Sequence, residues 1–173
     1  MPFLVGDNLK ILKELMPYLI IITVVIFIRT FIATPVRVDG SSMVPKLKNN
    51  DILILNKLSR NYKRFDIVVV KSHNTKLVKR IIGLPGESIE YKDNVLYING
   101  KKVKDVTPEV TEDFDLESLY GIKKIPNNYY FVMGDNRDGS SDSRDYRIGL
   151  IKKNNILGKT ILRIFPLNKI GTL

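Results

Sequence analysis

Residues 15–33 read LMPYLIIITVVIFIRTFIA, a run of 19 residues with a single charge, Arg29. A helix needs about 20 predominantly apolar residues to cross a bilayer, so this run predicts one membrane-spanning helix. We expect Pro17 in the first turn of that helix, where its missing N–H costs little. Arg29 lies near the end of the run, from where its long side chain can reach the interface.

The flanks of the run predict how it sits in the membrane. The run is long for the apolar core of a signal peptide, and no clean small-residue cleavage site follows it, so we expect a retained anchor rather than a cleaved leader. Lys10 and Lys13 precede it, which favours a cytoplasmic tail at residues 1–14 and an extracytoplasmic domain at residues 34–173.

Beyond the anchor, short runs rich in Val, Ile and Leu predict β-strands. The pairs Asp93-Asn94 and Asn99-Gly100 separate such runs and predict tight hairpins, because both turn residues need positive φ. Residues 105–124 are acidic and weakly periodic, which fits a loop or one short helix. The expected strands are Ile52–Leu55, Ile67–Val70, Lys76–Ile82, Ser88–Tyr91, Val95–Ile98, Lys101–Val103, Tyr129–Met133 and Ile156–Phe165. We therefore expect a mainly β protein in which one N-terminal helix precedes an antiparallel β domain, with a small insertion at about 88–128.

Composition narrows the kinds of site that the chain can hold. It has no cysteine, which excludes thiolate metal sites and disulfides, and its one histidine, His73, excludes a His-rich metal centre. We expect no metal and no cofactor. Residues 1–33 hold three basic and two acidic side chains, so the rest of the chain carries +9 of the net +10. This charge favours anionic lipid over nucleic acid as a partner, since no nucleic-acid-binding motif occurs, although a merely soluble cationic surface explains it equally well.

A candidate nucleophile, Ser42, lies a few residues beyond the anchor and needs a base to activate its hydroxyl. His73 lies in a polar stretch between two strands and is expected in an exposed turn, so a Ser-His-Asp triad is disfavoured. A lysine serves as a base only when neutral, which burial on the apolar side of a strand promotes. Lys79 would share a strand face with Leu77 and Ile81, although most lysines in strands keep their charge at the surface.

Four motifs in order carry a resemblance to a known family. They are VDGSSMVPKL at 38–47, RFDIVVV at 64–70, VKRIIGLPGE at 78–87 and GDNRDGSSDSRDYRIG at 134–149. The last could be a plain polar turn or a cation-binding loop, but it does not match the spacing of a calcium loop. Together with the anchor, the four resemble the signature boxes of bacterial type I signal peptidases, the membrane-anchored Ser/Lys proteases that remove signal peptides from exported proteins. The match spans nearly the whole chain and implies the signal-peptidase β fold in its short form.

The resemblance implies two catalytic side chains and one that supports them. Ser42 would be the nucleophile, Lys79 the general base, and Ser140 the hydroxyl that helps to orient the lysine amine. Many relatives have a serine that contributes to the oxyanion hole where this chain has Gly40. We therefore expect the hole to depend on the backbone N–H of Ser42, with a water or the amide of Gly40 helping.

The resemblance also implies supporting roles. Asp142 and Arg144 match a structural acid and arginine of the family, and we expect Arg80 to pair with Asp142, so that the pair lies beside a lysine that must remain uncharged. Two other departures from the usual boxes, Lys46 for threonine and Phe65 for glycine, do not involve the two catalytic residues. Substrates would carry small residues at positions −1 and −3, held in shallow apolar pockets. The expected pocket residues are Met43, Val38, Leu47 and Val78.

Two other readings compete with this one. Self-cleaving Ser/Lys repressors share the two catalytic residues, but they are soluble and cut an internal Ala-Gly bond that this chain lacks. An anchored β module that binds lipid or a partner is the non-enzymatic alternative. Lysine at position 79 and the absence of a transit peptide favour a bacterial enzyme. We expect a monomeric, single-pass protein of the bacterial plasma membrane that acts on signal-peptide-bearing preproteins.

Overall fold

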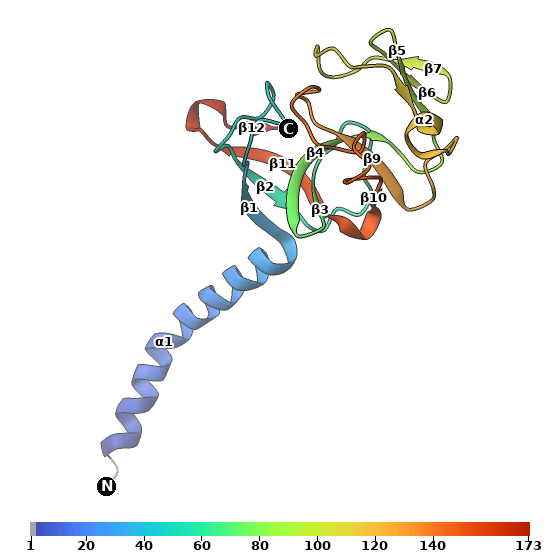
Figure 1. The fold of residues 1–173 in the computed structure, drawn as a ribbon. Coiled ribbons are helices and arrows are strands. Elements are labelled where there is room, and N and C mark those ends of the chain that lie inside the picture. The colour runs from blue at the N-terminus through green and yellow to red at the C-terminus, as the bar shows by residue number, and fades with distance from the viewer. Residues whose placement is uncertain (1–2) are drawn as a thin grey trace.

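A computed structural model describes residues 3–173 of the chain, with side chains from Leu12 onward. One long helix projects from a β domain (Figure 1). The helix comprises α1 (Phe3–Phe27) and a π-helical end, η1 (Ile28–Ile32), and residues Leu12–Ile32 within it are long and apolar enough to span a membrane. The expected apolar helix is therefore confirmed. The position expected for Pro17 is wrong, because the helix begins well before the apolar run and Pro17 lies in its interior.

Eight strands form the main sheet, in the order β1-β2-β11-β3-β4-β9-β10, with β12 paired to β11. Every pairing in it is antiparallel. The strands are β1 (Ala33–Arg37), β2 (Ile52–Asn56), β3 (Ile67–Ser72), β4 (Thr75–Gly83), β9 (Tyr129–Met133), β10 (Ile151–Lys152), β11 (Ile156–Phe165) and β12 (Gly171–Thr172). Two short 3-10 helices flank β11, namely η2 (Lys153–Asn155) and η3 (Leu167–Lys169).

A smaller sheet lies to one side of the main one (Figure 1). Its order is β7-β6-β5-β8, from β5 (Ile89–Lys92), β6 (Val95–Ile98), β7 (Lys101–Val103) and β8 (Phe114–Asp115). The acidic segment thus contributes a short strand as well as a short helix, α2 (Leu116–Tyr120). Asp115 begins that helix with a capping box in which its carboxylate accepts from Ser118 N at 2.7 Å. Gly121 ends it at a φ of +67°.

The eight strands expected from the sequence are all present, four of them with the expected ends and four with ends that differ by one or two residues. Four further strands were not expected. β8, β10 and β12 have two residues each, too few to show a periodicity. β1 contains Pro35, which is tolerated there because β1 lies at the edge of the main sheet.

Strand β4 is covered on both faces, and this positions the site. Ile81 packs in one apolar cluster with Val68, Val70 and Val132, while Ile82 packs in another that reaches the smaller sheet. Side chains on successive residues of a strand point to opposite faces. Both faces of β4 at Lys79 and Arg80 are therefore shielded from water, and the two residues are 2% and 7% exposed.

Candidate active site

Lys79 is buried in the middle of the main sheet and has a hydroxyl as its hydrogen-bond partner. It pairs with Val68 of β3 in register, and its Nζ donates to Ser140 Oγ at 2.8 Å. Burial lowers the pKa of Lys79 to about 8, because the charged amine loses its hydration. The positive charge of Arg144 lowers this pKa further, whereas the nearby carboxylate of Asp142 opposes the shift. A neutral amine is therefore accessible near physiological pH.

Ser140 connects this amine to a fully buried carboxylate. Its hydroxyl accepts from Lys79 and donates to Asp142 Oδ2 at 2.8 Å. Asp142 is 0% exposed and also accepts from Gly134 N at 2.9 Å and from the guanidinium of Arg144 through both oxygens. The carboxylate is thus fixed by several donors, and the orientation of the Ser140 hydroxyl is fixed with it.

Ser42 is half-buried in the turn that follows β1, and the loop after β9 holds that turn in place. Asn136 donates its backbone N–H to Ser42 O at 3.0 Å, and its side-chain amide donates to Ser41 O at 3.3 Å. Gly134 lies between Ser42 and Ser140, since a Cβ at this position would collide with both Ser140 Oγ and Ser42 O. Among the described side chains, Lys79 Nζ is hydrogen-bonded to Ser140 and not to Ser42, so the Ser42 hydroxyl is not tied to the amine in this state.

The partner expected for Arg80 is wrong. Arg80 pairs in a bidentate manner with Asp135, at 2.7 and 2.6 Å, and donates to Phe65 O at 2.8 Å. Arg80 lies opposite Met133 in register, and Asp135 follows that residue by two positions, so it falls on the same face. Asp142 instead accepts from Ser140 and pairs with Arg144.

The backbone around the turn bears on the expected oxyanion hole. Gly40 has a φ of +94°, a conformation that glycine adopts without strain, and its N–H donates to Asn49 Oδ1 at 3.1 Å. Its amide is therefore already engaged. The backbone N–H of Ser42 has no acceptor among the hydrogen bonds of the residues described, and so it is the more available donor.

The residues expected to line a substrate pocket gather under the same turn. Val38, Met43 and Leu47 are at most 3% exposed and pack with Leu53 and Ile67. Val78, the residue before Lys79, packs against this cluster and is half-buried. The structure brings the four together in one buried apolar cluster, and Val38, Met43 and Leu47 belong to the same stretch of chain as Ser42.

One further residue of the site, Arg137, was not predicted from the sequence, and it is 1% exposed. It donates to Tyr91 OH at 2.7 Å, to Thr111 Oγ1 at 2.9 Å and to Gly134 O at 3.1 Å, and it pairs with Asp105 at 2.7 Å. It thereby fastens the smaller sheet and the acidic segment to the loop that carries Ser140. Its role could not be found from the motif, because nothing in the pattern distinguishes it from the other charged residues of the same segment.

Comparisons with known proteins agree on one family. A sequence profile described as signal peptidase, peptidase S26, matches residues 11–165. Signal peptidase I of Bacillus caldolyticus is 40% identical over 164 residues, which cover 87% of this chain and 89% of that protein. Signal peptidase I S of Bacillus subtilis (strain 168) is 39% identical over 181 residues, with 95% of each covered. The crystal structure of a signal peptidase I from Enterococcus faecalis V583 is 38% identical, with a TM-score of 0.53, and the match covers 57% of this chain and 96% of that one.

Proposed function

Since the chain belongs to the signal peptidase family, peptidase S26, and is a signal peptidase I that removes signal peptides, we propose that it does so with Ser42 as nucleophile and neutral Lys79 as general base. One observation carries this proposal. Lys79 is a buried amine whose hydrogen-bond partner is a hydroxyl, beside the turn that holds Ser42. A lysine in such surroundings can lose its proton at moderate pH and accept another from a nearby hydroxyl.

The proposed reaction has two halves. Ser42 Oγ attacks the scissile carbonyl carbon while its proton passes to Lys79 Nζ, and the ammonium then gives that proton to the departing amine. The result is an acyl-enzyme at Ser42 with a neutral Lys79. A water then attacks the ester carbonyl and loses a proton to Lys79. Lys79 returns that proton to Ser42 Oγ as the ester C–O bond breaks, which releases the signal peptide with a free carboxyl group and restores the serine hydroxyl.

Ser140 would act by orienting the amine. Its hydroxyl accepts a hydrogen bond from Lys79 Nζ and donates its own hydrogen to Asp142. The direction of both hydrogen bonds is therefore fixed. The remaining positions of Nζ, including the lone pair of the neutral amine, are free to face Ser42. Arg144 holds Asp142 in place, and Arg80 has the corresponding structural role with Asp135.

We assign the oxyanion hole to the backbone N–H of Ser42. A contribution from Gly40 requires its hydrogen bond to Asn49 to break, which makes it the weaker candidate. The apolar cluster of Val38, Met43, Leu47 and Val78 supports a preference for small side chains at positions −1 and −3, because closely packed apolar residues next to Ser42 leave little room for larger ones.

The proposed arrangement in the cell follows the anchor. Residues 1–14 lie in the cytoplasm, residues 15–33 span the plasma membrane, and residues 34–173 act outside as a monomer against anionic lipid, with an insertion at about 88–128. The basic residues before the span and the ability of long domains to cross regardless of charge support this orientation.

The test is cleavage of a model preprotein by the full chain in neutral detergent. Wild type is expected to release the mature protein, while Ser42→Ala and Lys79→Ala are folded and inactive. Ser41→Ala, which alters the adjacent serine, is the matched control and stays active. Cleavage by the Ser42→Ala variant at the wild-type rate would overturn the assignment of the nucleophile.

A further inference from the structure

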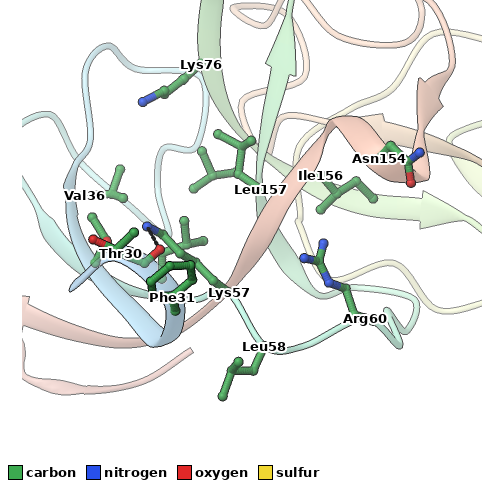
Figure 2. Close-up of a pocket in the computed structure, with 13 residues that line it drawn as sticks. Thr30, Phe31, Val36, Lys57, Leu58, Arg60, Lys76, Asn154, Ile156 and Leu157 are labelled. Atoms are coloured by element: carbon green, nitrogen blue, oxygen red, sulfur yellow. Dashed lines mark hydrogen bonds between the residues drawn. The ribbon is translucent and has the colours of Figure 1, made fainter. Parts of the chain in front are cut away.

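A groove of about 730 Å³ lies where the anchor helix joins the main sheet. Figure 2 shows side chains converging on it from the helix end, from the segment after β2 and from the start of β11. Its walls are largely apolar and include Phe31, Val36, Leu58 and Leu157. None of Ser42, Lys79 and Ser140 lines it, so the groove is separate from the candidate active site.

Three cations lie around this apolar wall. Lys57 and Arg60 come from the segment after β2, and Lys76 comes from the start of β4. No carboxylate occurs among the 13 residues that line the groove (Figure 2). In the part of the chain that the structure describes, none of the three cations forms an ion pair with an acidic side chain. The groove therefore combines an apolar surface with an uncompensated positive charge, which favours a ligand that is both apolar and anionic.

Lys57 also fixes the groove to the anchor. Its Nζ donates to the carbonyls of Arg29 at 3.0 Å and Thr30 at 3.1 Å, and its backbone N–H donates to Ile32 O at 2.9 Å. These carbonyls lie at the end of a helix, which carries partial negative charge and suits a cation. An ammonium has three N–H donors, so one donor of Lys57 remains for a ligand.

The position of the groove along the anchor points to the head-group region of a bilayer. The membrane-length segment ends at Ile32, and Thr30 and Phe31 at that end line the groove. Phe31 and Leu58 are 58% and 62% exposed, which is unfavourable in water but not against lipid. At this level, phosphate groups and the first carbons of acyl chains are close together.

We propose that this groove binds one anionic glycerophospholipid of the bilayer that holds the anchor. The phosphate accepts a hydrogen bond from the remaining N–H donor of Lys57, while Arg60 and Lys76 add positive charge elsewhere around the groove. An acyl chain lies along Phe31 and Leu157. The proposal rests on the groove and its charges and does not depend on the catalytic roles of Ser42 and Lys79.

Native mass spectrometry of the delipidated full chain in neutral detergent tests it. Phosphatidylglycerol, phosphatidylcholine with the same acyl chains, and glycerophosphate without chains are added in separate titrations. We expect one phosphatidylglycerol to bind with about a tenfold preference over phosphatidylcholine, because both lipids carry a phosphate but the choline ammonium cancels its charge and is repelled by the three cations. Glycerophosphate is expected to compete poorly, because it lacks the chain.

Paired variants separate the groove from the general surface charge. Arg60→Glu/Lys76→Glu is expected to lose the preference for phosphatidylglycerol. Lys101→Glu/Lys102→Glu changes the net charge equally on exposed residues of β7 and is expected to keep it. Arg60→Gln/Lys76→Gln removes the two charges of the groove without reversing them and is also expected to reduce the preference for phosphatidylglycerol. Thermal unfolding verifies that each variant is folded. Equal binding of the two lipids, equal loss in the β7 variant, or full competition by glycerophosphate would each overturn the proposal.

Discussion

The candidate active site and the groove beside the anchor are both rich in basic side chains, but the two regions balance that charge in opposite ways. Around Lys79, Arg80 pairs with Asp135 and Arg144 pairs with Asp142. Around the groove, the lining residues include three cations and no acid. In the active site the arginines are neutralised by carboxylates of the same site. In the groove the basic side chains have no such partners and can bind an external anion.

The difference shows what each lysine can do. The charges around Lys79 are paired with one another, and its hydrogen-bond partner is a hydroxyl rather than a carboxylate that would stabilise the ammonium. Burial therefore has the largest effect on the pKa of Lys79 and favours the neutral amine. Lys57 lies against helix carbonyls, which suit a cation, and it faces a half-open groove. The same side chain is therefore suited to proton transfer in one region and to anion binding in the other.

The largest expected effect comes from exchanging the two lysines for alanine. Lys79→Ala is expected to lower kcat/KM on a soluble signal-peptide substrate by about a thousandfold or more, because the serine loses its base. Lys57→Ala is expected to leave that constant nearly unchanged, since Lys57 lies outside the site. Steady-state kinetics measures kcat/KM for the two variants. A comparable loss of kcat/KM in both would show that the two lysines do not have different roles.

The next effect tests whether the charges near Lys79 must remain paired. Arg80→Met leaves the carboxylate of Asp135 buried without its partner, and loss of one member of a buried pair costs about 3–5 kcal/mol of unfolding free energy. Arg147→Met breaks the Arg147–Asp145 pair, whose arginine side chain is 70% exposed, and is expected to change stability little. Chemical denaturation of both variants measures the difference, and equal stability would show that the pairing at β4 is unimportant.

A third variant tests the packing between the two serines. Gly134→Ala places a methyl group against Ser140 Oγ and Ser42 O, which must move apart, and about a hundredfold loss in kcat/KM is expected from the misplaced nucleophile. Gly171→Ala is the matched control, because a Cβ there meets no atom within 4 Å. Retention of full activity in Gly134→Ala would mean that the close approach of these loops is not needed.

The smallest expected effect is a displacement of the pH profile. The base must be neutral, so kcat/KM should rise with pH and level off above about 8, the pKa of Lys79. Arg144→Met removes a charge that lowers this pKa and should move the midpoint upward, whereas Asp142→Asn removes one that raises it and should move the midpoint downward. Shifts of about one pH unit are expected from charges at this range. Shifts in the same direction for both variants would contradict the electrostatic account.

Much of the fold could be predicted because local chemistry specifies it. The hairpin between β6 and β7 turns at Asn99 and Gly100, whose φ values are +51° and +72°, and the hairpin between β5 and β6 turns at Asp93 and Asn94 in the same region of φ. Residue type alone identifies such turns. His73 likewise lies exposed in the turn between β3 and β4, as its polar surroundings predicted.

The rest depends on contacts between distant segments. Asp135 and Asp142 belong to one motif, and only the register of β4 against β9 decides which of them meets Arg80. The burial of Arg137 depends on the smaller sheet folding back over the loop after β9. The groove likewise could not be predicted, because Lys57 and Lys76 are brought together by sheet order and not by sequence spacing.

The place of β11 in the main sheet has a consequence for how the protein folds. β11 lies between β2 and β3, although residues 57–155 separate it from β2 and residues 73–155 separate it from β3 along the chain. Until β11 arrives, β1–β2 and β3–β4–β9–β10 are two separate pieces with unpaired edges, which are prone to associate with other chains. Closure of the sheet must therefore wait until residues 156–165 have been synthesised, and it is expected to be slow and sensitive to aggregation.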